Sequence, residues 1–260
     1  LEPSGETVAR PAAASDDPGE LGPADVVLFA VKAQDLEAVA PLCRPLLGPE
    51  TLVIPLLNGV EATSRLGARL GAGRVLTGFC QISVFVIEPG VIRRLGDFAR
   101  FRFAEADGTR SARALAAAEA LSAAGIEAGV PEDVERELWL KFMFLASFAG
   151  LTAAARCTAG EIRASAALSE TLAAAVAEIG ALARASGVAI SVEDEARTVD
   201  LVTGLPEAMR ASMANDLLAG RALEVDWLSG AVARLSAEAG LAAPVHATLA
   251  AVLAPLEAGA

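Results

Sequence analysis

The sequence predicts an α/β domain with a parallel sheet, followed by an all-helical domain, with the boundary near residue 131. Three observations support this. Within residues 25–130, short apolar runs alternate with stretches of helical spacing, which is the pattern of α/β domains. After that, strand signals nearly vanish and long alanine-rich helical stretches replace them. The length of 260 residues allows two domains that each have a core. We therefore expect domains at residues 1–131 and 132–260.

The first domain is expected to contain the parallel sheet. The runs DVVLFAV (25–31) and TLVIPLL (51–57) are apolar on both faces, as strands buried beneath helices are. A crossover helix at 35–47 would join them. Further strands are predicted at residues 74–81, 83–95, 98–105 and 126–130. A turn is expected at Pro89-Gly90, and a helix at 111–125 that ends in glycine precedes the last strand.

The second domain is expected to consist of helices. The first of them begins near Glu132 and ends near Gly150. The others are predicted at 159–186, 192–204, 206–219, 222–239 and 245–257. Residues 191–194, SVED, have the spacing of a capping box, which marks the start of a helix.

Composition excludes several classes of function. The net charge of −12 argues against nucleic acid, because its phosphates would be repelled. Cys43, Cys80 and Cys157 are scattered, so we expect neither a disulfide framework nor a cysteine metal site. His246 is the only histidine, and no HExxH or GxSxG motif occurs, so zinc proteolysis and hydrolase chemistry lack their residues.

Hydrophobic residues make up 54% of the chain, which raises the question of a membrane. Much of that fraction is alanine, and no uninterrupted apolar run reaches the roughly 18 residues that a span needs. We therefore expect no membrane span and a cytoplasmic protein, which the acidic composition also favours.

The segment 138–151 carries a single charge, Lys141, in an otherwise apolar helical run. One interpretation is a surface lysine that pairs with Glu137, four residues earlier. The other is a lysine held inside, because a helix that is apolar nearly all round is a buried one. A desolvated lysine can act as an acid or hydrogen-bond donor. Lys141 is thus a candidate catalytic residue.

Glu224 is the second candidate catalytic residue. On the helix predicted at 222–239, its neighbours three, four and seven residues later are apolar, whereas Asp226 shares a face with serine and glycine. We expect Asp226 to be solvated. Glu224 is expected to point inward and to approach Lys141, because a buried charge is tolerated when it is paired. The alternative is a partly exposed helix glutamate.

Polar residues also follow the first two predicted strands. Lys32 follows one of them and Asn58-Gly59 follow the other. The carboxyl ends of parallel strands border the ligand crevice of such sheets, so both positions are candidates for binding. The alternatives are a loop cation and an ordinary turn. Ser212, taken alone, is an ordinary helix serine, and His246 is expected to be structural.

Seven segments occur in an order that covers essentially the whole chain. They are ADVVLFAVKA, LLNGV, IEPGVIRRLG, ELWLKFMF, LTAAARCTAGEIRA, SMANDLLAGRALEVDWLSGAV and APVHATL. In these segments the chain resembles the ketopantoate reductase (2-dehydropantoate 2-reductase) family. The resemblance implies a Rossmann-like dinucleotide-binding domain, an all-α substrate and dimerisation domain, and NADPH-dependent reduction of a 2-keto acid in pantothenate biosynthesis. It also implies a possible homodimer.

The resemblance gives each candidate residue a role. Lys141 matches the family's catalytic lysine, which stabilises the alkoxide that forms on the keto oxygen. Glu224 matches the acid that holds the substrate hydroxyl and orients this lysine. Ser212 matches a contact to the substrate carboxylate. Asn58 matches an asparagine near both nicotinamide and substrate, and Lys32 a lysine on the cofactor side. No metal is implied.

Two features depart from the family. Leu145 and Ala149 stand where its best-known members carry asparagines, which makes a bulkier or less polar 2-keto acid an alternative substrate. No glycine-rich phosphate loop occurs either, because GARLGAGRV (67–75) follows a helical stretch and leads into a strand, the reverse of the fingerprint. We expect the family's first strand, GxGxxG loop and helix to precede Leu1, and residues 1–260 alone to bind NADPH weakly.

Three functional hypotheses follow. The first is an NADP-dependent oxidoreductase that reduces ketopantoate or a related branched 2-keto acid. The second keeps the fold and changes the substrate, as a hydroxyacid dehydrogenase of another specificity. The third is a non-catalytic relative that folds or dimerises without binding the dinucleotide.

Overall fold

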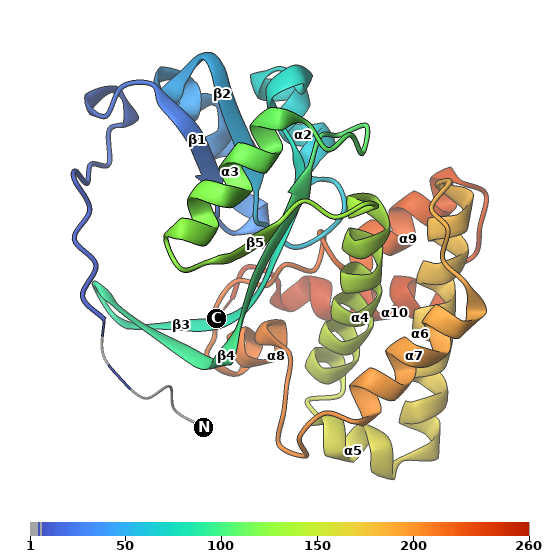
Figure 1. Cartoon of the computed structure of the whole chain (residues 1–260). Helices are drawn as coiled ribbons and strands as arrows, with labels where there is room; N and C mark the ends of the chain where they lie inside the picture. Colours follow the sequence, from blue (N-terminus) through green and yellow to red (C-terminus); the bar gives the residue numbers. More distant parts are fainter. Residues whose placement is uncertain (1–4, 6, 260) are drawn as a thin grey trace. The chain divides into compact units, whose positions relative to one another are not determined.

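The computed structural model describes residue 5 and residues 7–259. The chain forms two compact units, drawn in Figure 1. The first contains Leu1–Leu57 and Ala62–Val134, and the second contains Asn58–Glu61 and Glu135–Ala260. The first unit has strands and helices and the second is helical, which confirms the predicted fold class. Asn58–Glu61 interrupts the first unit in sequence and packs within the second.

The first unit begins with a parallel strand pair. β1 (Ala24–Phe29) lies beside β2 (Leu47–Pro55), with Val27 opposite Val53. An isolated parallel bridge then joins Val53 to Val75, just before the next strand. Val53 and Ile54 are fully buried, as expected for a strand that is apolar on both faces.

A long antiparallel hairpin follows. β3 (Thr77–Glu88) turns at Pro89-Gly90 into β4 (Val91–Ala104), and β5 (Glu127–Gly129) pairs with β4 in parallel. The prediction of three separate strands between residues 74 and 105 was therefore wrong. Residues 95–98 do not separate two strands. They lie where the pairing shifts register between Ile82 and Val84, so β4 continues through an irregularity.

Among its described residues, the first unit has three α-helices: α1 (Leu36–Val39), α2 (Ala62–Leu70) and α3 (Ala112–Ala123). Short 3₁₀ helices lie at Pro18–Glu20, Ala33–Asp35, Ala40–Leu46 and Ala72–Arg74. The predicted crossover helix is α-helical for only four residues, because Pro41 and Pro45 lack the N–H groups that an α-helix needs. α3 is capped by Ser111 and stops before Gly125 at φ 85°.

The second unit contains seven α-helices among the residues that the structure describes. They are α4 (Val134–Ala154), α5 (Ala159–Ala164), α6 (Ala166–Ala185), α7 (Val192–Thr203), α8 (Ser212–Leu218), α9 (Ser229–Glu238) and α10 (Pro244–Leu253). A 3₁₀ helix at Ala254–Leu256 follows α10.

Three predicted helices are shorter or interrupted. The helix at 159–186 is broken at Ser165, whose extended backbone ends α5 and whose side chain caps α6. The helix at 206–219 begins only at Ser212. The carbonyl groups of Glu207 and Met209 instead accept bonds from the first amides of α5, and residues 206–209 form a turn that the Met209 amide closes on the Pro206 carbonyl at 2.9 Å. The helix at 222–239 begins only at Ser229.

α4 forms the centre of this unit. Met143, Ala146 and Ala149 are fully buried, and side chains from the helices around α4 complete one apolar cluster. α4 and α6 are long and apolar enough to cross a membrane by length and composition, with 67% and 39% of their most apolar windows buried. Two such helices are weak evidence for a membrane, since the core helix of a globular protein passes the same test.

α6, α9 and α10 are joined by buried polar contacts. The His246 ring lies between the Ser229 hydroxyl (3.3 Å) and the Ala175 carbonyl (3.1 Å), and the residue is fully buried. The Glu178 carboxylate accepts the amides of Val245 and His246 at 2.7 and 2.9 Å, which satisfies the start of α10. The structural role expected for His246 agrees with these contacts.

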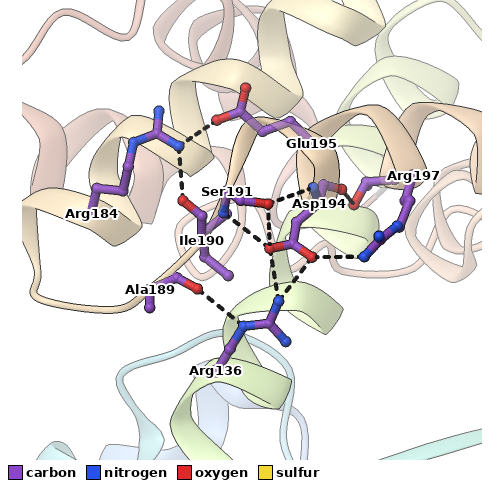
Figure 2. Close-up of polar contacts among 9 residues, drawn as sticks. Arg136, Arg184, Ala189, Ile190, Ser191, Asp194, Glu195 and Arg197 are labelled. Atoms are coloured by element: carbon purple, nitrogen blue, oxygen red, sulfur yellow. Dashed lines mark hydrogen bonds and ion pairs between the residues drawn. The ribbon is translucent and has the colours of Figure 1, made fainter.

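Figure 2 shows how the start of α7 is held against α4. Ser191 and Asp194 form the predicted capping box. The Asp194 carboxylate also accepts Arg136 of α4 at 2.8 and 2.9 Å, and Arg136 bonds the Ala189 carbonyl at 3.0 Å. Asp194 is 5% exposed. Hydrogen bonds from the Ser191 backbone and from Arg136 lower the pKa of its carboxyl group.

Candidate functional site

The centre of the candidate site is Asn58, which joins the two predicted catalytic residues. Lys141 Nζ donates to Asn58 Oδ1 at 3.2 Å, and Asn58 Nδ2 donates to Glu224 Oε2 at 3.1 Å. All three residues belong to the second unit. The structure therefore brings together residues from three distant parts of the sequence.

The three side chains differ in exposure. Glu224 is buried, at 6% exposed, whereas Lys141 and Asn58 are half-buried. A buried carboxylate is stable only when it has hydrogen-bond donors, and Asn58 supplies one. The amide also accepts one of the three N–H donors of the ammonium group, so it fixes the direction in which Lys141 points.

Lys141 lies in the second turn of α4, between the buried residues Trp139 and Met143. Its partner Asn58 is 83 residues away in sequence, so a local pair with Glu137 does not describe its whole environment. The extended side chain of a lysine can lie along apolar neighbours and place its ammonium at the polar contact.

Glu224 is buried for a reason other than the predicted one. It does not lie on a helix, because α9 starts five residues later. It begins a turn in which its carbonyl accepts the amides of Trp227 and Leu228 at 3.3 and 3.2 Å. The predicted contrast still holds, since Asp226 is exposed.

The segment Asn58–Glu61 approaches this turn closely. Gly59 has φ 92°, and a Cβ atom there would lie 3.0 Å from the carbonyl oxygen of Trp227. Glycine is therefore required twice, by the backbone conformation and by the available space. At the end of the segment, the Glu61 carboxylate accepts Arg234 Nη2 of α9 at 2.6 Å.

The remaining predicted site residues are not among the hydrogen-bond partners of Asn58. Lys32 is exposed after β1 in the first unit, where the carboxyl ends of β1 and β2 lie side by side, with Phe29 opposite Pro55. Ser212 is exposed at the first position of α8 in the second unit. Within the described part of the chain, no hydrogen bond connects Ser212 to Lys141, Asn58 or Glu224.

Sequence reasoning missed Glu61, Trp227 and Arg234 as supports of the site, and it noted Gly59 only as the neighbour of Asn58. A glycine after Asn58 was a visible signal, but it is equally typical of a turn. Nothing in the spacing of Glu61 and Arg234 indicates that they form a pair, because they are 173 residues apart.

No group of three or more metal-ligating side chains is present in the part of the chain that the structure describes. The segment 67–75 forms the end of α2 and the 3₁₀ helix Ala72–Arg74 before β3. It thus runs from helix to strand, as expected, and does not have the strand–loop–helix order of a dinucleotide loop.

Two family descriptions match the chain. "Ketopantoate reductase PanE/ApbA" matches residues 1–108, and "Ketopantoate reductase PanE/ApbA C terminal" matches residues 133–257. Together they cover both units.

Curated relatives and solved structures agree. The uncharacterized oxidoreductase YkpB of Bacillus subtilis is 32% identical over 240 residues, covering 92% of this chain and 79% of the relative. A 2-dehydropantoate 2-reductase of Halobacterium salinarum is 33% identical over 258 residues, covering 96% and 82%. The crystal structure of 2-dehydropantoate 2-reductase from Geobacter metallireducens superposes with a TM-score of 0.84 at 27% identity, covering 92% and 79%.

Proposed function

We propose that this chain, which belongs to the ketopantoate reductase family, reduces ketopantoate or a related branched 2-keto acid with NADPH. Membership makes it an oxidoreductase of the keto-acid reductase type. The observation that supports reduction of a 2-keto acid at this site is the array in which Asn58 bonds both Lys141 and Glu224.

This array suits a carbonyl that gains negative charge. A bound NADPH would supply a hydride to the keto carbon. In our proposal the Lys141 ammonium donates a hydrogen bond to the keto oxygen and then a proton to the alkoxide. A cation held in place before the reaction stabilises the transition state without the cost of reorienting solvent.

Glu224 and Asn58 have supporting roles in the proposal. The Glu224 carboxylate lies on the far side of the Asn58 amide from the ammonium, so it holds the amide in one orientation. That orientation presents the amide oxygen to Lys141. Glu224 would also accept a hydrogen bond from the substrate hydroxyl, and Ser212 would donate one to its carboxylate.

For the cofactor, the proposal assigns residues 1–131 to dinucleotide binding and residues 132–260 to substrate binding and dimerisation. The exposed cation Lys32 follows the carboxyl end of β1, the edge of a parallel sheet at which nucleotides bind. An ammonium there suits a phosphate group of a dinucleotide, and the proposal takes NADP as the cofactor.

The proposal includes a second class of substrate, 2-keto acids that are less polar than ketopantoate. Leu145, one helical turn after Lys141, is half-buried, and Ala149, two turns after it, is fully buried. Residues four apart share a helix face, so this face offers no polar group at either position. That observation favours a less polar 2-keto acid over ketopantoate, as in a hydroxyacid dehydrogenase of another specificity.

The test is steady-state reduction by the full-length protein of ketopantoate and of 2-keto acids with branched or aromatic side chains. Each is assayed with NADPH and with NADH by the loss of reduced-nicotinamide absorbance. We expect a higher kcat/KM with NADPH and turnover of at least one branched 2-keto acid. No turnover of any compound would contradict the proposal and favour a non-catalytic relative.

The proposal also covers the pathway, the cellular location and the oligomeric state of the protein. With ketopantoate as its substrate the protein would act in pantothenate biosynthesis, and with either substrate we place it in the cytoplasm as a homodimer that needs neither a membrane nor nucleic acid. Light scattering of the purified protein checks the dimer, since a monomer at all concentrations would contradict it.

A further inference from the structure

We propose that the ion pair between Glu61 and Arg234 is a positioning contact that holds Asn58 between Lys141 and Glu224. The inference rests on the proposed function, because it assigns a purpose to the position of Asn58. It concerns two residues that do not themselves touch the substrate.

The argument starts from the shape of the segment Asn58–Glu61. It is neither helix nor strand, and the residues on both sides of it belong to the first unit. Its place in the second unit therefore depends on its own contacts. Asn58 bonds Lys141 and Glu224, Gly59 lies against Trp227, and Val60 packs on the apolar cluster.

The ion pair fixes the other end of this segment. Arg234 Nη2 lies 2.6 Å from Glu61 Oε2, and the side chain of Glu61 is only 15% exposed. A charge-assisted bond to a largely buried carboxylate is stronger and less screened than a surface pair. With its two ends held, a four-residue segment has little freedom to move Asn58.

Arg234 has a second carboxylate neighbour, which provides a matched control. Glu238 lies one turn later on α9, at 3.7 Å from Arg234 Nη1, and its side chain is 62% exposed. Glu238→Gln removes one negative charge near Arg234, as Glu61→Gln does, but it does not touch the segment. An exposed pair at that distance contributes little.

The first measurement needs no substrate. Amide hydrogen exchange is followed by mass spectrometry in peptides that contain residues 58–61. We expect Glu61→Gln and Arg234→Gln to accelerate exchange there, whereas Glu238→Gln leaves it unchanged. Unchanged exchange in Glu61→Gln would overturn the proposal. Because it needs no catalysis, this result stands even if no substrate is turned over and the proposed function fails.

The second measurement is kinetic. A misplacement of about 1 Å can cost up to about 100-fold in rate, so we expect Glu61→Gln to lower kcat about 10-fold with a smaller change in KM. Arg234→Lys keeps the cation and should restore most of the kcat lost in Arg234→Gln. Accelerated exchange with an unchanged kcat would overturn the positioning role, as would an equal loss of kcat in Glu238→Gln.

Discussion

The amide of Asn58 suits a place between a cation and an anion, because it presents an acceptor to one and a donor to the other. Lys141 and Glu224 use these two sides at 3.2 and 3.1 Å. Neither a carboxylate nor an ammonium at position 58 could satisfy both neighbours. The half-buried asparagine therefore sets the geometry of the candidate site.

A substitution of Gly59 tests the close contact beside Asn58. Gly59→Ala should lower the free energy of unfolding by about 1–3 kcal/mol, because φ 92° is unfavourable for alanine and the new Cβ would lie 3.0 Å from the Trp227 carbonyl. It should also lower kcat, since relief of that contact shifts Asn58. Urea unfolding and steady-state kinetics measure the two effects.

Gly90→Ala is the matched control for this change. Gly90 has φ 82° with no atom within 4 Å of an added Cβ, so only the conformational cost applies. If both variants lost the same stability and both kept full activity, the close approach of Gly59 to Trp227 would have no role in the site.

At the scale of elements, the helices whose ends carry local signals were predictable. Ser191 and Asp194 marked the start of α7 and Gly187 the end of α6, because caps act within a few residues. The late start of α9 was not predictable. Residues 222–228 have helical spacing, but Leu223 donates its amide to the distant Glu257 carbonyl instead.

The same distinction applies to the candidate site. Lys141 could be identified because one charge in an apolar helix is a local anomaly. The contact of Asn58 with Lys141 and Glu224 depends on how α4, the turn before α9 and the segment Asn58–Glu61 pack, and no spacing in the sequence encodes that packing. The resemblance to a family supplied the residues but not the bonds between them.

The hydrogen bonds at the start of α7 can be tested by substitution of Asp194. Asp194→Ala removes both the capping-box acceptor and the carboxylate that accepts the bond from Arg136 Nη2 (Figure 2). We expect a loss of about 2–3 kcal/mol in the free energy of unfolding, measured in urea. Glu193→Ala, at an exposed neighbouring position in the same first turn, should cost less than about 1 kcal/mol. Equal losses would contradict a specific role for the network.

For the whole molecule, we expect the free energy of unfolding to depend on pH just below neutrality because of His246. The sequence contains a single histidine. Burial of His246 lowers its pKa from 6.5 to about 4, despite the opposing hydrogen bond to the Ala175 carbonyl. The folded protein therefore holds this ring neutral where the unfolded chain protonates it.

The sign of the effect follows. Between pH 6.5 and about 4 the unfolded state binds more protons, so stability falls as the pH falls through this window. A pKa difference of about 2.5 corresponds to a total loss of about 3 kcal/mol. The lowered pKa of Asp194 adds a loss of the same sign at more acidic pH. Urea unfolding at a series of pH values and NMR titration of the one imidazole measure this. A ring that titrates near 6.5 in the folded protein would contradict it.

In the proposed reaction, the Lys141 ammonium stabilises the charge that forms on a keto oxygen. The most direct test compares Lys141→Ala with Ser212→Ala in steady-state reduction of the 2-keto acid panel, with circular dichroism to confirm folding.

Ser212 would bind a carboxylate whose charge is constant, so its loss should cost about 1.5–3 kcal/mol at most, mainly as a raised KM. Lys141 would face an oxygen whose charge grows, so its loss should lower kcat about 100-fold to 1,000-fold. A folded Lys141→Ala protein with near-native kcat on its best substrate would contradict this role of Lys141.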